Sequence, residues 1–212
     1  MKHIYCISGF GADERVFSKL DFGDNLIQFI PWLIPLKKES IEEYAKRMSE
    51  KIQHENPILL GLSFGGIMCI EIAKLIKAHK VILISSVKSF REFPLWMRLA
   101  GKSKLHKFFP LRSFKILEPL QNYNLGIENK DELKLVREYR SSIGQQYTDW
   151  AIDQILHWKS EWIPENCIHI HGGRDHIFPI KNIKADYVIA DGGHFMIMNR
   201  AQKVNAIIRE IL

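Results

Sequence analysis

Six short, mostly apolar runs recur along the chain, each four to six residues long. Near-continuous apolar runs of this length are typical of strands that are buried on both faces of a parallel sheet. The runs predict strands at residues 2–7, 26–30, 57–61, 81–84, 167–171 and 187–190.

Segments with apolar residues at helical spacing lie between these strands. Ser40 and Glu43 have the spacing of a capping box, which opens a helix that runs to about His54. Further helices are predicted at 12–20, from Gly65 onward, and at 133–143, 150–158 and 202–212. Strands that alternate with helices predict an α/β fold, a three-layer αβα sandwich with a mostly parallel sheet of about six strands.

The pattern changes between residues 87 and 162, where no strand is predicted. Aromatic and basic residues alternate there over helical stretches, and Pro94, Pro110, Pro119 and Gly126 interrupt them. We therefore predict that residues 1–86 and 163–212 form the core of the fold and that residues 87–162 are a helical insertion into it.

The composition fits one soluble globular domain. Of the 212 residues, 46% are hydrophobic and 25% are charged. The chain begins without an apolar signal segment, and its longest uncharged run, Pro57 to Ile70, is shorter than the roughly 20 residues of a membrane span. A cytoplasmic location is therefore expected. The three cysteines lie in apolar patterns and predict neither a disulfide framework nor a zinc site.

The positive charge is concentrated in one segment. Between Lys88 and Lys115, eight basic residues accompany a single acid, Glu92, so the rest of the chain is close to neutral. A basic segment beside an active site attracts an anionic substrate, and one with aromatic residues also suits a membrane surface or nucleic acid. A solvated helical face explains the same charges equally well, and no nucleic-acid partner is expected.

Ser63 occupies the corner between a predicted strand and a predicted helix. The sequence around it, Gly61-Leu62-Ser63-Phe64-Gly65, has the form Gly-x-Ser-x-Gly. Small residues are needed at the flanking positions because the turn brings the strand and the helix very close together. The turn would expose the Ser63 hydroxyl above the sheet, and the helix would direct its amide-rich end toward the same place. This is a suitable position for a nucleophile and an oxyanion.

Two other residues with suitable chemistry follow later strands. Asp175 and His194 each come shortly after a predicted strand, and parallel strands bring such positions to one edge of the sheet. A serine needs a base within hydrogen-bond reach, and the base needs a third group to orient it. Read alone, His194 is a loop histidine and Asp175 a turn residue; together with Ser63 they form the order nucleophile, acid, histidine. Asp191 is a competing acid.

Two other groups of residues suggest alternative sites. Gly9-x-Gly11 resembles the start of a dinucleotide-binding turn, but Glu14 stands where a third glycine is needed and no ribose-binding acid follows the next strand. His169, His171 and His176 invite a metal site, yet their spacing is not that of a zinc site. We therefore expect no cofactor and no metal.

Four motifs together resemble those of the α/β-hydrolase fold superfamily over nearly the whole chain. They are residues 9–11, 61–65, 172–179 and 192–195. The resemblance implies that Ser63 is the nucleophile, His194 the general base and acid, and Asp175 the orienting carboxylate. It also implies an oxyanion hole made by the backbone N–H groups of Phe64 and Phe10, with Gly11 as the other candidate because Ser8-Gly9 replaces the His-Gly of many relatives. The insertion at 87–162 resembles the family's lid.

The function that follows is a serine hydrolase that cleaves a small carboxylic ester or thioester through an acyl-enzyme. The basic segment favours a substrate with a carboxylate or phosphate. Three alternatives stay open: the same triad acting on a carbon–carbon or amide bond, a lyase reaction, and a non-catalytic protein that binds a ligand under the lid.

Overall fold

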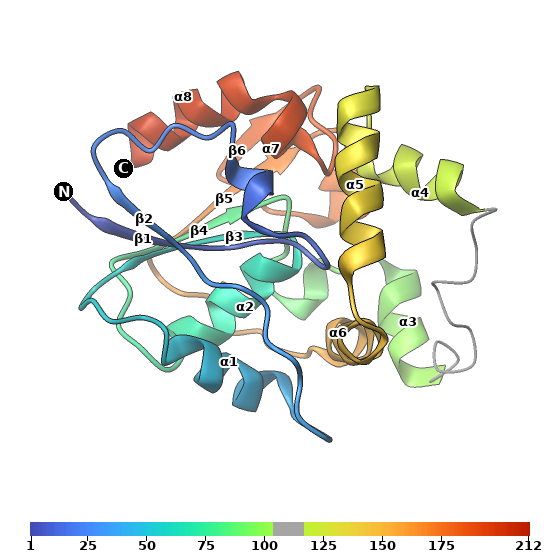
Figure 1. Cartoon of the computed structure of the whole chain (residues 1–212), viewed down its shortest axis with the longest axis horizontal. Helices are drawn as coiled ribbons and strands as arrows, with labels where there is room; N and C mark the ends of the chain where they lie inside the picture. The colour runs from blue at the N-terminus through green and yellow to red at the C-terminus, as the bar shows by residue number, and fades with distance from the viewer. Residues whose placement is uncertain (104–116) are drawn as a thin grey trace.

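A single six-stranded parallel sheet organises the protein in the computed structural model, which describes residues 1–103 and 117–212 (Figure 1). The strand order is β2-β1-β3-β4-β5-β6, and every neighbouring pair is parallel. The strands are β1 (His3–Ile7), β2 (Leu26–Phe29), β3 (Ile58–Leu62), β4 (Lys80–Ile84), β5 (Cys167–Gly172) and β6 (Tyr187–Ile189). The predicted fold class and its strands are confirmed.

Helices cover both faces of the sheet (Figure 1). On one face, α1 (Ile41–Ser49) and α2 (Phe64–Ala73) pack over strand residues such as Leu59. On the other, the 3-10 helix η1 (Glu14–Phe17), α7 (Met196–Asn199) and α8 (Ala201–Ile211) pack over residues such as Leu60. Successive strand residues thus enter opposite cores, which is why the strands read as continuous apolar runs.

Several helices lie between β4 and β5 in the chain. They include the short 3-10 helix η2 (Phe90–Glu92), then α3 (Leu95–Ser103), α4 (Glu118–Leu125), α5 (Lys130–Ser142) and α6 (Gln145–His157). Helix α6 packs against the core on the α1–α2 face of the sheet. The indole N–H of its Trp150 donates to the Glu39 carbonyl oxygen at 2.8 Å. A 3-10 helix, η6 (Ile180–Asn182), links β5 to β6. The division into core and insertion stays a prediction.

Three predicted elements differ from the structure. The helix predicted at residues 12–20 is only η1, and the helix that begins with the Ser40–Glu43 capping box ends at Ser49 rather than near His54. Helix α2 is not amphipathic, because every residue from Phe64 to Ile72 is buried. The sheet on one side, with α1 and α6 on the other, leaves this helix no solvent face.

No helix in the described ranges is long and apolar enough to cross a membrane.

Candidate active site

Ser63 lies at a strained turn between β3 and α2. Its backbone angles are φ 53° and ψ −119°, a region that L residues rarely occupy and that costs on the order of 1–3 kcal/mol. A Cβ atom at Gly61 would lie 2.4 Å from the Gly65 carbonyl oxygen, and one at Gly65 would lie 2.2 Å from the Ile7 carbonyl oxygen. The two flanking glycines are therefore required sterically, as the sequence pattern predicts.

Hydrogen bonds hold the Ser63 backbone in this conformation. Its N–H donates to the Ile84 carbonyl oxygen at 2.9 Å, and its own carbonyl oxygen accepts from the Ser86 hydroxyl at 2.7 Å and from the Gly66 N–H at 2.9 Å. Ser86 follows β4, the strand next to β3. Ser86 is not among the predicted site residues, because its only sequence signal is that of a small polar residue at the carboxyl end of a strand.

The structure brings the side chains of Ser63, His194 and Asp175 into one line. His194 Nε2 is 2.9 Å from Ser63 Oγ, and His194 Nδ1 is 2.8 Å from Asp175 Oδ2. Asp175 and His194 are buried, with exposed fractions of 3% and 6%. The Phe178 ring packs against the His194 ring, with their centroids 5.5 Å apart. The loops after β3, β5 and β6 supply the three residues.

Asp175 is held as a carboxylate by its surroundings. Its Oδ1 accepts hydrogen bonds from the backbone N–H groups of Ile177 at 2.8 Å and Phe178 at 2.9 Å. Burial by itself raises the pKa of this carboxyl. The nearby His194 and the hydrogen bonds lower the pKa by more than burial raises it, so the net shift is downward. Asp175 therefore stays charged and presents Oδ2 to His194.

His171, on β5, lies behind Asp175. Its Nε2 is 2.8 Å from the Phe178 carbonyl oxygen and 3.6 Å from Asp175 Oδ2, and its Nδ1 is 3.1 Å from Nε2 of His169. His176 is exposed and stacks on Tyr123 instead. No group of residues in the described part of the chain has the arrangement of a metal site.

The turn after β1 approaches Ser63 from the neighbouring strand. The Gly9 carbonyl oxygen accepts from the Ala12 N–H at 3.1 Å, and Gly11 has φ +69°, so Phe10 and Gly11 form the centre of a tight turn. A Cβ atom built at Gly9 would lie 3.4 Å from the Ser63 Cβ. Among the described residues, the N–H groups of Phe10 and Phe64 donate to no protein acceptor. Both remain available to a bound group.

Trp32 connects the two predicted oxyanion positions. Its indole N–H is 3.0 Å from the Ser8 hydroxyl oxygen and 3.1 Å from the Gly9 carbonyl oxygen. Its ring stacks on Phe64, with a centroid distance of 5.0 Å and an interplanar angle of 7°. Trp32 is not among the predicted site residues, because an aromatic residue after a strand gives no signal of its partners.

The other predicted groups lie elsewhere or outside the described residues. Asp191 bonds to Arg200 and Lys203, and not to His194. In the basic segment, Lys88 is 3.7 Å from Asp186, and Arg91 is 2.8 Å from Glu161. Five side chains of the segment are not described: Lys102, Lys104, Lys107, Arg112 and Lys115.

No protein-family model and no curated protein sequence matches this chain. Solved structures match it at low identity. An esterase from Thermogutta terrifontis has a TM-score of 0.70 and 17% identity, over 99% of this chain and 89% of the esterase. A hydrolase from Oleispira antarctica has a TM-score of 0.73 and 14% identity, over 100% and 91%. An epoxide hydrolase from Bacillus megaterium has a TM-score of 0.70 and 14% identity, over 100% and 93%.

These solved structures share one architecture and differ in the reactions that their names state. At such identities the likeness concerns the fold and not the reaction. The parallel sheet and its helical layers agree with that architecture over the length of the chain. This protein therefore has the α/β-hydrolase fold.

Proposed function

We propose that this protein is a serine hydrolase that cleaves a small carboxylic ester or thioester through an acyl-enzyme. One observation carries the proposal: His194 stands between Ser63 Oγ and Asp175 Oδ2 at 2.9 Å and 2.8 Å. A histidine so placed accepts the serine proton at one nitrogen while a carboxylate fixes its tautomer at the other. The strained Ser63 turn supports the same role, since strain of this kind clusters at functional sites.

In the proposed reaction, Ser63 Oγ attacks the carbonyl carbon of the substrate while His194 Nε2 takes the hydroxyl proton. The tetrahedral intermediate collapses, the bond to the leaving oxygen or sulfur breaks, and His194 donates the proton to that atom. Water then attacks the acyl-enzyme as His194 removes its proton. The carboxylic acid product leaves, and Ser63 recovers its hydroxyl.

The negative oxygen of each tetrahedral intermediate would bind to the N–H groups of Phe10 and Phe64. Donors that meet the charge only as it forms contribute on the order of 3 kcal/mol each to the transition state. The N-terminal end of α2 adds a partial positive charge at the same place. The proposed chemistry uses these groups and no metal or organic cofactor.

Substrate selection is assigned to residues 87–162, which we propose act as a lid. A substrate with a carboxylate or phosphate stays part of the proposal because of the basic segment. Its support rests on the lysines that follow in the segment, since the ion pairs of Lys88 and Arg91 already offset part of its charge. Replacing Lys102, Lys104 and Lys107 by Gln should raise KM for an anionic ester, and added salt should weaken this effect.

The decisive experiment is intact-protein mass spectrometry after treatment with a fluorophosphonate probe. Wild type should gain one adduct on Ser63, Ser63→Ala none, and His194→Ala should react far more slowly. Ser18→Ala, at an exposed serine of the same chain, is the matched control and should react like wild type.

A folded wild type that gains no adduct would overturn the proposal and favour a non-catalytic ligand-binding protein. If the adduct forms, product analysis with ester, thioester, amide and carbon–carbon substrates identifies the bond that is cleaved. Turnover of only the last two classes, or a lyase product, would replace the ester and thioester assignment.

A further inference from the structure

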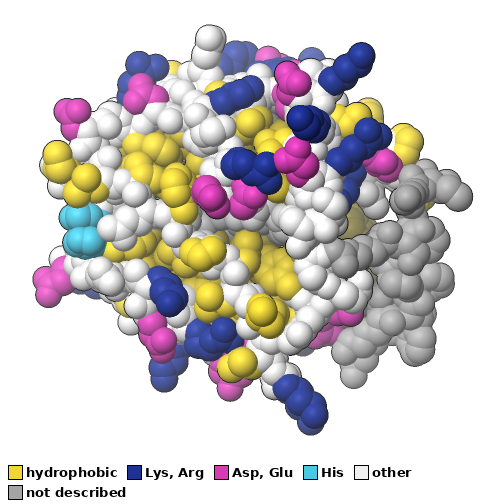
Figure 2. Space-filling model, viewed as in Figure 1, with side chains coloured by type: hydrophobic (Ala, Val, Ile, Leu, Met, Phe, Trp, Pro, Cys, Tyr) yellow, Lys and Arg dark blue, Asp and Glu magenta, His cyan; other side chains and the backbone are white. Residues whose placement is uncertain are grey.

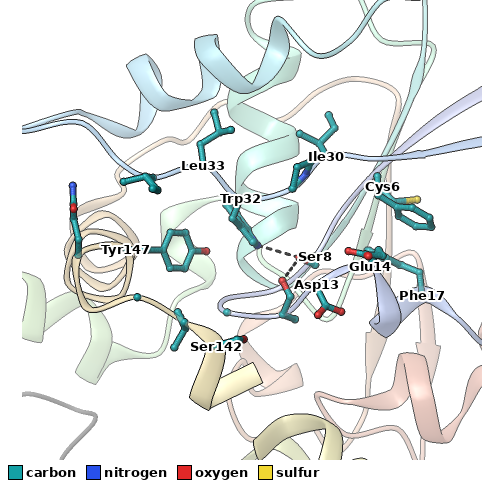
Figure 3. Close-up of a pocket in the computed structure, with 18 of the residues that line it drawn as sticks. Cys6, Ser8, Asp13, Glu14, Phe17, Ile30, Trp32, Leu33, Ser142 and Tyr147 are labelled. Atoms are coloured by element: carbon teal, nitrogen blue, oxygen red, sulfur yellow. Dashed lines mark hydrogen bonds between the residues drawn. The ribbon is translucent and has the colours of Figure 1, made fainter. Parts of the chain in front are cut away.

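A cavity of about 450 Å³ lies outside the line formed by Ser63, His194 and Asp175. Three segments surround it: the turn after β1, the segment after β2, and the connection from α5 into α6 (Figure 3). Its walls include Ser8, Ala12, Trp32, Leu33, Ser142 and Tyr147. The volume is within the range of roughly 300–1,000 Å³ that is typical of small-molecule sites.

The turn at Gly9 and Phe10 separates this cavity from Ser63. Ser8, Gly11 and Ala12 line the cavity, whereas Gly9 faces Ser63. The Trp32 indole lies beside this turn, and its N–H donates to the Ser8 hydroxyl oxygen and to the Gly9 carbonyl oxygen. The cavity therefore lies on the side of this turn that faces away from Ser63.

The hydroxyl of Tyr147 is directed into the cavity. Tyr147 is 8% exposed, and Figure 3 shows its hydroxyl pointing from α6 toward Trp32. The hydroxyl oxygen is almost fully shielded from solvent, and the Gly11 backbone N–H is close enough to lower its pKa, but the hydroxyl hydrogen has no acceptor among the described residues. Burial raises the pKa of Tyr147 well above its ordinary value, so the hydroxyl keeps its proton and can donate. A buried polar group without a partner costs free energy that a ligand could recover.

The remaining walls favour a neutral and mostly apolar ligand. Phe17, Ile30 and Leu33 are among the apolar lining residues, and hydrophobic side chains also gather over the segment after β2 on the face that Figure 2 shows. The charged lining residues in the described part of the chain are two acids, Asp13 and Glu14. Arg15 already pairs with Asp13 at 2.8 Å, and no basic residue stands among the described lining residues, so an anionic ligand would gain no ion pair in this cavity.

We propose that this cavity is a binding site for a neutral, mainly apolar small molecule with one hydroxyl or carbonyl group, which hydrogen-bonds to the Tyr147 hydroxyl. The site is separate from Ser63, so it holds or fails independently of the proposed hydrolase activity.

The test is a titration of the full chain with 2-indanol and with indane, followed by amide and indole N–H chemical shifts. The two probes differ only in the hydroxyl group. Saturable shifts should centre on Gly11, Gly144 and the Trp32 indole, all in the cavity wall. Shifts centred on the Ser63 and His194 amides instead, or no saturable shift for 2-indanol, would overturn the proposal.

The variant Tyr147→Phe removes the hydroxyl without changing the ring. The Kd of 2-indanol should rise about 2- to 13-fold, the equivalent of one neutral hydrogen bond, and that of indane should not change. Tyr123→Phe, at a tyrosine that is 63% exposed on α4, is the matched control and should bind both probes like wild type. Equal binding of 2-indanol by wild type and Tyr147→Phe would show that the hydroxyl is not a ligand. Tighter binding of 2-indanecarboxylate than of 2-indanol would contradict the neutral class.

Discussion

His169 and His171 form a fully buried pair on β5, with Nε2 of the first 3.1 Å from Nδ1 of the second. The Phe178 carbonyl oxygen can only accept, so His171 Nε2, 2.8 Å away, carries the hydrogen. Nδ1 of a neutral His171 then accepts from His169. Burial lowers the pKa of both rings, which favours this neutral arrangement even though Asp175 partly offsets the shift at His171. The pair thus supports the backbone that donates to Asp175.

Replacing His171 by Phe should destabilise the protein. The change keeps a ring in the core but leaves the Phe178 carbonyl oxygen and His169 Nε2 without their partner. A buried group that loses its partner costs about 1–3 kcal/mol in the free energy of unfolding, which urea denaturation measures. His176→Gln changes an exposed histidine five residues further along the chain and should stay within about 0.5 kcal/mol of wild type. Equal losses in both variants would contradict the buried role of His171.

The stability of the protein should fall as the pH drops below 6.5, partly because of His169. Burial and the neighbouring His171 hold its pKa well below the ordinary value of 6.5, so the unfolded chain takes up the proton first. The free energy of unfolding is unaffected by the protonation of His169 above pH 6.5 and decreases as the pH falls from 6.5 toward the folded-state pKa of His169. Between pH 7 and pH 5.5, wild type should lose about 1 kcal/mol more than His169→Gln. Parallel pH dependences from urea denaturation would rule out a titrating His169.

Asp175→Asn should abolish most of the proposed activity while the fold is kept. An amide at this position does not select the tautomer of His194 that accepts the serine proton, and the equivalent change in a serine protease lowers kcat about 10⁴-fold. Steady-state hydrolysis of an ester found by screening measures the effect. Asp191→Asn is the matched control, because Asp191 bonds to Arg200 and Lys203 and not to His194. A larger loss in Asp191→Asn would reverse the assignment of the acid.

Trp32→Phe should lower kcat more than it changes KM. Phenylalanine can keep the stack on Phe64 but cannot donate to Ser8 and Gly9, so the turn that carries the Phe10 N–H loses its anchor. The loss of a neutral hydrogen bond predicts a decrease of about 2- to 13-fold for each bond. Trp162→Phe, at a tryptophan that is 46% exposed, should keep the wild-type kcat. A change confined to KM would indicate a role in binding rather than in positioning the turn.

The sheet was predictable because its strands are buried on both faces. Residues 81–84 are all apolar, as expected of a strand that is buried on both faces. The observed strand, β4, is one residue longer than the predicted one. Short or fully buried helices were harder. Residues 12–20 contain apolar positions at helical spacing, but only Glu14–Phe17 form a 3-10 turn. Helix α2 is apolar except for the buried Glu71, so it offers no periodicity that reveals burial on every side.

The site was predictable only where the chain itself fixes geometry. Gly61 and Gly65 define the corner at Ser63, and parallel strands bring Asp175 and His194 to the same edge. The assignment of their roles is a proposal that the labelling experiment tests. Contacts made across the fold had no local signal. Trp32 reaches Gly9 from the segment after β2, and Tyr147 lines the cavity because α6 packs against the core on the α1–α2 face of the sheet.

The all-parallel sheet has a consequence for how the molecule forms. No neighbouring pair of its strands can be joined by a hairpin turn, so each pairing has to bring distant segments together. The pairing of β4 with β5 joins segments on either side of residues 85–166, the longest such closure in the sheet. Contacts between such distant segments slow folding. We therefore expect the β1–β2, β3–β4 and β5–β6 pairs, whose closures are short, to form before β4 pairs with β5 during refolding. Asp175 and His194 should then reach Ser63 late, an order that pulsed hydrogen exchange can follow.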